Sequence, residues 1–404
     1  MTRPTGPGLI LSDPTLRLIA LAIICIGTVA AALAPYQSMI AVQIFAIPPR
    51  LYTAILVTAA LISVSSSVVV GILTDQHAIR RVTAILSTAL LVTGYSLVRL
   101  APSALTFTLT HAIISPLAGS LFGQLFALTR IVTRDRPEAE RDRIAALIRA
   151  AFALPFIVIL PLWSLAIAAG VSLLNVYTLA LAAALIGLAL ILRDWPQDAQ
   201  LPSHPRSGLS FRAAMAELAQ PALMARMVAL GLAASSVSLY MVLLGLTLTT
   251  LGHRPQSEVA LFAGLTAGLE IPVMLLTTPL LRRLSKPKVI ALGSALHATF
   301  MVLLSQSAHL PAILPLAAVA AMGAGILLTI PLGYMQDLLH HRPGAGGALI
   351  AVNQFLVAAF AALAFLIGTQ ISGYSLAALI GAAFALTGAG LLLWLDRAGK
   401  YARD

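Results

Sequence analysis

A carboxylate lies inside one of the most apolar stretches of the sequence. The stretch "AGLTAGLEIPVMLL", residues 263–276, carries Glu270 near its middle, and the apolar segment around it can cross a bilayer. A charged side chain at the centre of a membrane helix costs about 2.5–3.5 kcal/mol on insertion scales, so it must face a cavity or a partner. Glu270 is therefore a candidate for binding a solute or a proton. The alternative is a glutamate that is hydrogen-bonded to a neighbouring helix.

The residues near Glu270 add hydroxyl groups to the same face of a helix. Thr266 lies four positions before Glu270, and Thr277 lies eleven positions after Thr266. Pro272 removes one backbone hydrogen bond and loosens the helix beside the carboxylate. A carboxylate in this setting can accept hydrogen bonds from sugar hydroxyls, or it can bind a proton.

The composition predicts that the element carrying Glu270 is one of many membrane-spanning helices. Of 404 residues, 59% are hydrophobic and only 10% are charged, whereas a soluble protein is about a quarter charged. Backbone polar groups in lipid must be satisfied within the element itself, so these runs are expected to be helices. We expect an all-α protein with twelve spans, at 16–36, 51–73, 82–100, 104–130, 145–169, 173–193, 222–250, 258–281, 288–306, 311–339, 346–370 and 375–395.

The positive charge of the chain is explained by membrane topology. The formal net charge is +11, and all 25 Lys and Arg residues except Arg50, Arg99 and Arg254 fall on one side of the predicted spans. Basic residues mark the cytoplasmic side, so both termini are expected in the cytoplasm. No nucleic-acid partner is needed to account for the charge.

The spans divide into two sets of six around the longest polar interruption. An Arg-Arg pair after span two, at 80–81, recurs after span eight, at 282–283. Two six-helix halves are typical of a transporter built from parallel repeats, with a substrate site between the halves near the midplane. The expected parts are an N-terminal six-helix half at 1–193, a cytoplasmic linker at 194–220 and a C-terminal six-helix half at 221–404.

Several function classes lack their motifs in this sequence. It contains no G-x-x-x-x-G-K-[ST] phosphate loop, no H-E-x-x-H and no paired cysteines, since Cys25 is the single cysteine. We therefore expect neither an enzyme nor a cofactor or metal, and transport powered by ATP from this chain is excluded. A receptor remains an alternative of another class.

The segment "GILTDQHAIRR", Gly71 to Arg81, resembles a loop of the major facilitator superfamily. The pattern G-x-L-x-D-[RK]-x-[GH]-R-[RK] is matched at Gly71, Leu73, Asp75, Arg80 and Arg81, with one extra residue before the arginines. In that superfamily the loop is a conformational latch between the halves, and the resemblance implies this gating role here. The alternative is that these basic residues only set the topology.

Three further stretches resemble signatures of the sugar efflux transporter family within that superfamily. They are "GQLFALTR" (123–130), "AGLEIPVM" (267–274) and "MQDLLHHRPGAGGAL" (335–349). The resemblance implies export of sugars or glycosides in exchange for protons. Span five lacks the glycine before proline of many antiporters, and the interior is poor in polar groups. A proton-coupled multidrug exporter of amphipathic compounds is therefore the alternative on the same fold.

Polar residues on the spans that line the cavity in the superfamily are candidates for binding substrate or protons. Amides pair with sugar hydroxyls, and aromatic rings stack on apolar sugar faces. Single hydroxyls more often bond back to their own helix, and the histidines of spans four and nine, at 111 and 297, more often bond between helices than relay protons. With Glu270, the candidates are Tyr36, Gln37, His111, Gln124, Ser236, Asn353 and Gln354.

Two further charges lie at the cytoplasmic edge. Asp337 ends span ten near Arg342, where a gating salt bridge or a helix cap is favoured over a substrate contact. Arg149 opens span five as a gate charge or as a snorkelling arginine. Together these features predict a monomeric, multi-pass protein of a bacterial plasma (inner) membrane. It would contact lipid and move a small solute and protons by alternating access.

Overall fold

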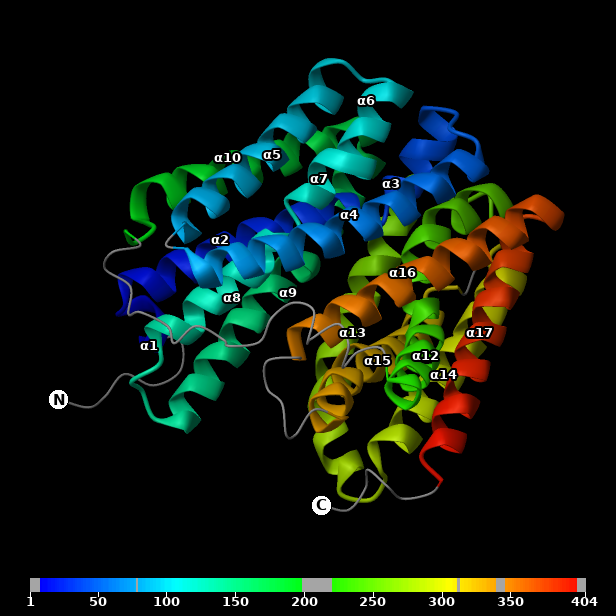
Figure 1. Ribbon diagram of the computed structural model, residues 1–404. Coiled ribbons are helices and arrows are strands. Elements are labelled where there is room, and N and C mark those ends of the chain that lie inside the picture. Colours follow the sequence, from blue (N-terminus) through cyan, green and yellow to red (C-terminus); the bar gives the residue numbers. More distant parts are fainter. Residues whose placement is uncertain (1–7, 78, 198–219, 311–312, 339–345, 398–404) are drawn as a thin grey trace. The chain divides into compact units, whose positions relative to one another are not determined.

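The computed structural model describes residues 8–77, 79–197, 220–310, 313–338 and 346–397, and these ranges contain helices and no strand (Figure 1). Within these ranges, twelve helical segments are long and apolar enough to cross a membrane, so the prediction of twelve spans is confirmed. Their bounds differ from the predicted ones by a few residues, and most at span five, which begins at Glu138.

The first six spans are built from helices that are interrupted in two places. The π-helical turn η1 follows span one, the π-helical turn η2 lies within span four between α6 and α7, and a short 3-10 helix, η3, begins span six. The elements are α1 (Gly8–Leu11), α2 (Pro14–Leu33), α3 (Gln37–Met39), η1 (Ile40–Ile44), α4 (Pro49–Gln76), α5 (Arg80–Leu100), α6 (Ala104–Leu109), η2 (Thr110–Ile114), α7 (Ser115–Leu117), α8 (Ser120–Val132), α9 (Glu138–Ala168), η3 (Leu173–Asn175) and α10 (Val176–Asp194).

The last six spans are more regular, with one π-helical turn at the end of span seven. The elements are α12 (Pro221–Leu246), η5 (Thr247–Leu251), α13 (Gln256–Leu281), α14 (Lys286–Ser307), α15 (Leu316–Leu338), α16 (Gly346–Ile371) and α17 (Tyr374–Leu395). Most of the predicted linker, residues 198–219, lies outside the described residues.

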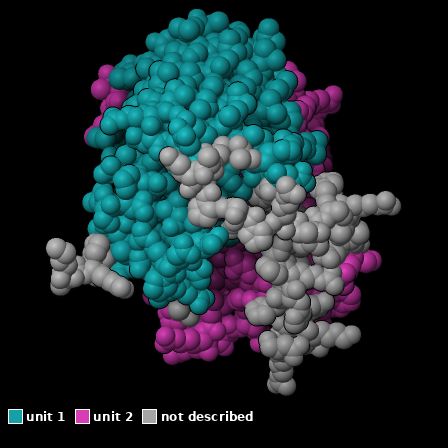
Figure 2. Space-filling view, turned by 60° about the vertical axis from the view of Figure 1, so that its left-hand side comes forward, with its two compact units in different colours: residues 1–34, 61–163, 170–207 teal, residues 35–60, 164–169, 208–404 magenta. Residues whose placement is uncertain are grey.

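The chain forms two compact units (Figure 2). Unit 1 comprises residues 1–34, 61–163 and 170–207, and unit 2 comprises residues 35–60, 164–169 and 208–404. Side chains of residues 35–60 bond to later helices of unit 2. The Tyr36 hydroxyl, for example, donates to the backbone oxygen of Gln256 at 3.3 Å.

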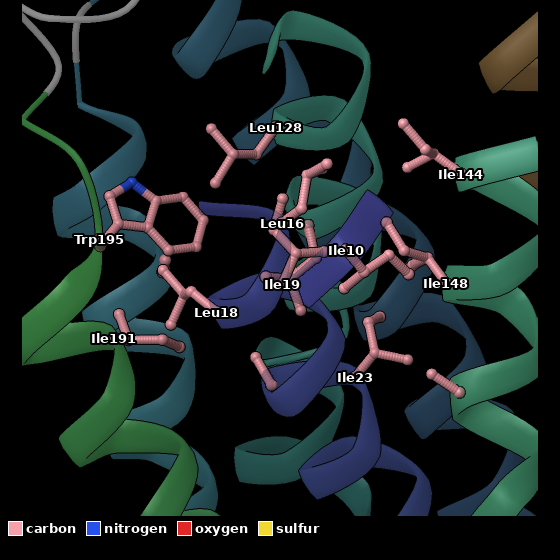
Figure 3. Close-up of a cluster of buried hydrophobic side chains, with 14 of the residues drawn as sticks. Ile10, Leu16, Leu18, Ile19, Ile23, Leu128, Ile144, Ile148, Ile191 and Trp195 are labelled. Atoms are coloured by element: carbon pink, nitrogen blue, oxygen red, sulfur yellow. The ribbon is translucent and has the colours of Figure 1, made fainter. Parts of the chain in front are cut away.

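The core of unit 1 surrounds α2. Its buried side chains include Leu16, Ile19 and Ile23, and aliphatic residues of α8, α9 and α10 pack around them (Figure 3). The helix starts at a defined residue, because the Asp13 carboxylate caps it by accepting a hydrogen bond from Thr15 N at 2.9 Å. Lipid is as apolar as these side chains, so close packing holds the helices together.

In unit 2, glycines allow helices to approach one another closely. A Cβ atom added at Gly388 of α17 would lie 2.4 Å from the backbone nitrogen of Ala233 in α12. At Gly323 of α15 it would lie 2.6 Å from the backbone nitrogen of His297 in α14. Small residues at such crossings are typical of membrane helix packing, and they give unit 2 an interlocked interior.

A buried ion pair joins the termini of three helices in unit 2. The Arg226 guanidinium of α12 donates to the Asp396 carboxylate, which follows α17, with Nε 3.0 Å from Oδ1. The Tyr334 hydroxyl of α15 donates to the other carboxylate oxygen at 2.9 Å. Both charged side chains are largely buried, so this ion pair is shielded from water.

Candidate functional site

Glu270 lies near the middle of α13 and is partly exposed. Among the described residues, none forms a hydrogen bond or an ion pair with its carboxyl group. On the backbone side, α15 approaches closely, because a Cβ atom at Gly325 would lie 3.3 Å from the backbone oxygen of Glu270. The carboxyl group thus keeps its capacity to bind a proton or a hydroxyl donor.

A tyrosine and a threonine bond to each other one helical turn before Glu270. The Tyr240 hydroxyl of α12 donates to Thr266 Oγ1 of α13 at 3.4 Å, one helical turn before Glu270. Thr266 donates its own proton to the backbone oxygen of Phe262 at 3.0 Å, and Thr277 donates likewise to Met274 at 2.6 Å. Both threonine protons are therefore used within α13, as is typical of hydroxyls in membrane helices.

The two histidines that the sequence singled out have different environments. His111 bonds between helices, with Nε2 2.7 Å from the Tyr177 hydroxyl of α10. His297 is fully buried, and its ring packs edge-on against Tyr240 at 6.1 Å and against Phe300 at 5.3 Å between ring centres. Neither ring nitrogen of His297 has a hydrogen-bond partner among the described residues.

Gln124 is held by side chains of unit 1. Its Oε1 accepts a hydrogen bond from Thr83 of α5 at 2.8 Å, and its Nε2 donates to Ser120 of its own helix, α8, at 3.0 Å. The side chain is buried. These bonds fix the amide, so a solute that used Gln124 would meet one remaining N–H and one remaining lone pair of the oxygen.

The remaining predicted binding residues are distributed over α3, α12 and α16, together with the residue before α3. Tyr36 is fully buried, and its hydroxyl is bonded to the α13 backbone. Ser236 and Asn353 are buried, and among the described residues Ser236 Oγ and Asn353 Oδ1 have no hydrogen-bond partner. Gln37 is half-buried and Gln354 is exposed. Buried oxygens without partners are rare in proteins.

The predicted latch segment is mostly helical. Gly71 lies on the last turns of α4 with no atom within 4 Å of the place its Cβ would take, and Arg80 is the first residue of α5. Arg81 Nη2 donates to the backbone oxygen of Leu192 in α10 at 2.9 Å, within unit 1. The side chain of Asp75 lies outside the described part of the structure.

The two predicted edge charges have partners that the sequence did not indicate. Asp337 pairs with Lys286 at the start of α14, with Nζ 2.7 Å from Oδ2, whereas Arg342 lies outside the described residues. Lys286 also donates to the backbone oxygen of Gly333 at 3.1 Å. Arg149 is exposed, with its guanidinium carbon 6.0 Å from the Phe126 ring centre, which is a cation–π distance.

The sequence matches a family over most of its length. Residues 19–362 match the family model described as Major Facilitator Superfamily. A curated relative from Deinococcus radiodurans, named "Putative sugar efflux transporter", is 25% identical over 392 residues, which cover 95% of this chain and 98% of the relative.

Solved transporter structures share the fold at low sequence identity. The nucleoside transporter NupG superposes with a TM-score of 0.76 at 12% identity, covering 95% of this chain and 99% of that one. A D-xylose-proton symporter superposes with a TM-score of 0.72 at 13% identity, covering 95% and 97%. A peptide transporter, POT, in complex with sulfate superposes with a TM-score of 0.74 at 14% identity, covering 96% and 95%.

Proposed function

The chain belongs to the Major Facilitator Superfamily, and we propose that this multi-pass membrane transporter exports sugars or glycosides in exchange for protons. The observation that carries the proposal is Glu270, a carboxyl group within a membrane span that has no hydrogen-bond or ion-pair partner among the described residues. The sugar efflux relative over nearly the whole chain supports the substrate class. We place the protein in a bacterial plasma membrane as a monomer with cytoplasmic termini.

Glu270 would couple sugar export to proton movement in the opposite direction, because its one carboxyl group can bind either the sugar or the proton. As a carboxylate it accepts hydrogen bonds from several sugar hydroxyls, and as a carboxylic acid it carries the proton. A charge inside the membrane is costly. The protein therefore changes between the conformations of its transport cycle more easily when a proton neutralises Glu270. Sugar and proton would therefore occupy the site in turn.

A second candidate function is proton-coupled export of amphipathic compounds. Hydrogen bonds within unit 1 already engage two of the polar candidates, His111 with Tyr177 and Gln124 with Thr83 and Ser120. Fewer polar groups then remain for a sugar. A solute with a mainly apolar surface would need few polar partners beyond Glu270, and a hydrophobic cation would suit the Glu270 carboxylate best.

The test is exchange of radiolabelled lactose and of a thioglucoside in proteoliposomes, with and without an imposed pH gradient. We expect the gradient to accelerate exchange in the wild type and to have no effect in Glu270→Gln. The matched control is Glu258→Gln on the same helix, because Glu258 is already paired with Arg254 at the helix start. It should keep the acceleration.

Two outcomes would contradict the proposal. If the pH gradient still accelerated sugar exchange in Glu270→Gln, Glu270 would not be the residue that couples sugar transport to protons. Failure of the wild type to exchange either sugar, with export of a hydrophobic cation instead, would replace the sugar by the amphipathic class. Failure to exchange any of these solutes would favour a receptor.

A further inference from the structure

Parts of the backbone recur along the chain with an offset of 207 residues. The π-helical turns η1 and η5 start 207 residues apart, at Ile40 and Thr247. The non-glycine residues with positive φ in the described ranges, Ala46 and His253, have the same separation. So do the first residues of the helices that follow, α4 and α13. Positions of α4 and α13 can therefore be compared one by one.

Ser63 is the residue of α4 that corresponds to Glu270. Each lies 14 positions after the first residue of its helix. Both side chains are half-buried, and neither has a hydrogen-bond or ion-pair partner among the described residues. A carboxylate inside a membrane span without such a partner must face a cavity rather than lipid. The repeat places Ser63 at the equivalent position of unit 1, so Ser63 also faces away from lipid.

Both positions lie where their helix meets a glycine two spans later. In unit 2, a Cβ atom at Gly325 of α15 would lie 3.3 Å from the backbone oxygen of Glu270. In unit 1, a Cβ atom at Gly119, directly before α8, would collide with the Ser63 hydroxyl and lie 3.4 Å from its Cβ. The two glycines are 206 residues apart. The repeat therefore includes the helix crossing itself as well as the helix position.

A break in span four adds polar groups to the crossing in unit 1. Helix α7 ends at Leu117, and α8 starts at Ser120. Ser66, three positions after Ser63, donates its proton to the backbone oxygen of Leu117 at 2.6 Å. The Ser63 hydroxyl, in contrast, keeps both its proton and its lone pairs for a further partner. A solute with hydroxyl groups can both donate to it and accept from it.

We propose that Ser63 is the counterpart of Glu270 in unit 1. Its hydroxyl binds the transported solute, and the same position can carry the proton when it bears a carboxyl group. This role rests on the proposed exchange of sugar for protons, to which it adds a binding residue. The equivalent crossings give both positions similar backbone surroundings, so their side chains decide their tasks. Serine forms hydrogen bonds with a sugar but does not release a proton near neutral pH, which leaves the coupling to Glu270.

The first test measures the contribution of Ser63 to solute binding. Ser63→Ala should raise the KM for lactose exchange about twofold to tenfold, which is the effect of one lost neutral hydrogen bond. The pH gradient should still accelerate exchange, because Glu270 is intact. The matched control is Ser65→Ala. Ser65 is exposed and lies about 200° around α4 from Ser63, so its removal should leave KM unchanged.

The second test moves the carboxyl group from unit 2 to unit 1. In a Cys25→Ala, Glu270→Gln background, Ser63→Cys is treated in proteoliposomes with 2-carboxyethyl methanethiosulfonate. The thiolate displaces methanesulfinate and forms a disulfide, so the folded protein acquires a carboxyl group at this position. Acceleration of sugar exchange by the pH gradient, absent before the treatment, should return. Methyl methanethiosulfonate forms the same disulfide without a carboxyl group and should leave the acceleration absent.

Labelling also reports whether the solute reaches this position. In Cys25→Ala, Ser63→Cys with Glu270 intact, lactose at ten times its dissociation constant should slow the reaction about tenfold, since few sites are then empty. Mass spectrometry of the intact protein follows the reaction. A thiol that the reagent does not reach, or that lactose does not protect, would place residue 63 away from the solute and overturn the proposal.

The remaining outcomes separate this proposal from the proposed function. An unchanged KM in Ser63→Ala, or an equal rise in Ser65→Ala, would remove Ser63 from solute binding. Acceleration that stays absent after carboxyethylation, or that also returns with the methyl reagent, would refute the transfer of the coupling role. These results count against Ser63 alone when the wild type exchanges sugar beside them. No exchange by the wild type would instead refute the proposed function.

Discussion

Replacing Asp396 by alanine should destabilise unit 2 more than removal of any exposed charge. The carboxylate accepts hydrogen bonds from Arg226 Nε at 3.0 Å and from the Tyr334 hydroxyl at 2.9 Å. The Arg226 side chain is only 7% exposed and the Asp396 side chain 14%. Asp396→Ala therefore removes a bonded counter-charge from a guanidinium that has little access to water.

The magnitude follows from the burial and from the remaining bonds. Removing one partner of a buried ion pair costs about 3–5 kcal/mol. Arg226 keeps its bonds to the backbone oxygens of Ala222 at 3.0 Å and Leu395 at 2.9 Å, which soften the loss. We expect the lower end of the range, about 3 kcal/mol, and for a chain of this length a fall in the unfolding midpoint on the order of 3–5 °C.

The assay is thermal unfolding of the purified protein in detergent, with Asp194→Ala as the matched control. Asp194 ends α10, and its pair with Arg193 is exposed, with side chains 85% and 40% accessible for Arg193 and Asp194. Such a pair contributes at most about 1 kcal/mol, so the midpoint should move by no more than about 1 °C. Equal shifts in the two variants would refute the reasoning that burial decides the cost.

Two further predictions use the same assay. Gly323→Val should lower the unfolding midpoint by an amount that corresponds to at least about 2 kcal/mol, because its Cβ would meet the backbone of His297 at 2.6 Å. Gly390→Ala, with no atom within 4 Å of the added carbon, should leave the midpoint unchanged or raise it, and a fall as large as that of Gly323→Val would contradict the steric argument. His111→Phe should cost about 1 kcal/mol through its lost bond to Tyr177, and combining it with Tyr177→Phe should cost less than the sum of the two single changes. Strict additivity would show that the two side chains do not interact.

The sequence predicted the membrane helices well because length and apolarity alone decide a span. All twelve spans are confirmed, and the family match over residues 19–362 confirms the major facilitator fold. The π-helical turns, such as Ile40–Ile44, were not predicted. A uniformly apolar run shows no change in periodicity where the hydrogen-bond pattern changes, so sequence reasoning had no signal for them.

Only those parts of the candidate site could be predicted that a single residue indicates by its type and its position in a span. Glu270 stood out because a carboxylate within an apolar span is rare. The bond between Gln43 and Thr249 joins residues 206 positions apart, and the ion pair of Lys286 and Asp337 joins residues 51 apart. Such contacts depend on how helices rotate and cross, and no local pattern in the sequence encodes that. One signal was available for the contact of Gln43 with Thr249, since prolines recur 207 residues apart after both π-helical turns, at Pro48 and Pro255.

The π-helical turns η1 and η5 start 207 residues apart, and Gln43 of η1 donates a hydrogen bond at 3.1 Å to Thr250, the equivalent residue of η5. A surface that meets its own equivalent is the geometry of an isologous interface, which identical subunits use to form a twofold dimer. Gln43 and Thr250 meet in this way within one polypeptide. A six-helix ancestor with this turn could have paired with a second copy of itself before duplication and fusion joined the two. Once they were joined, each position could diverge independently, which is how an amide comes to face a hydroxyl where a symmetric dimer would have placed two identical side chains.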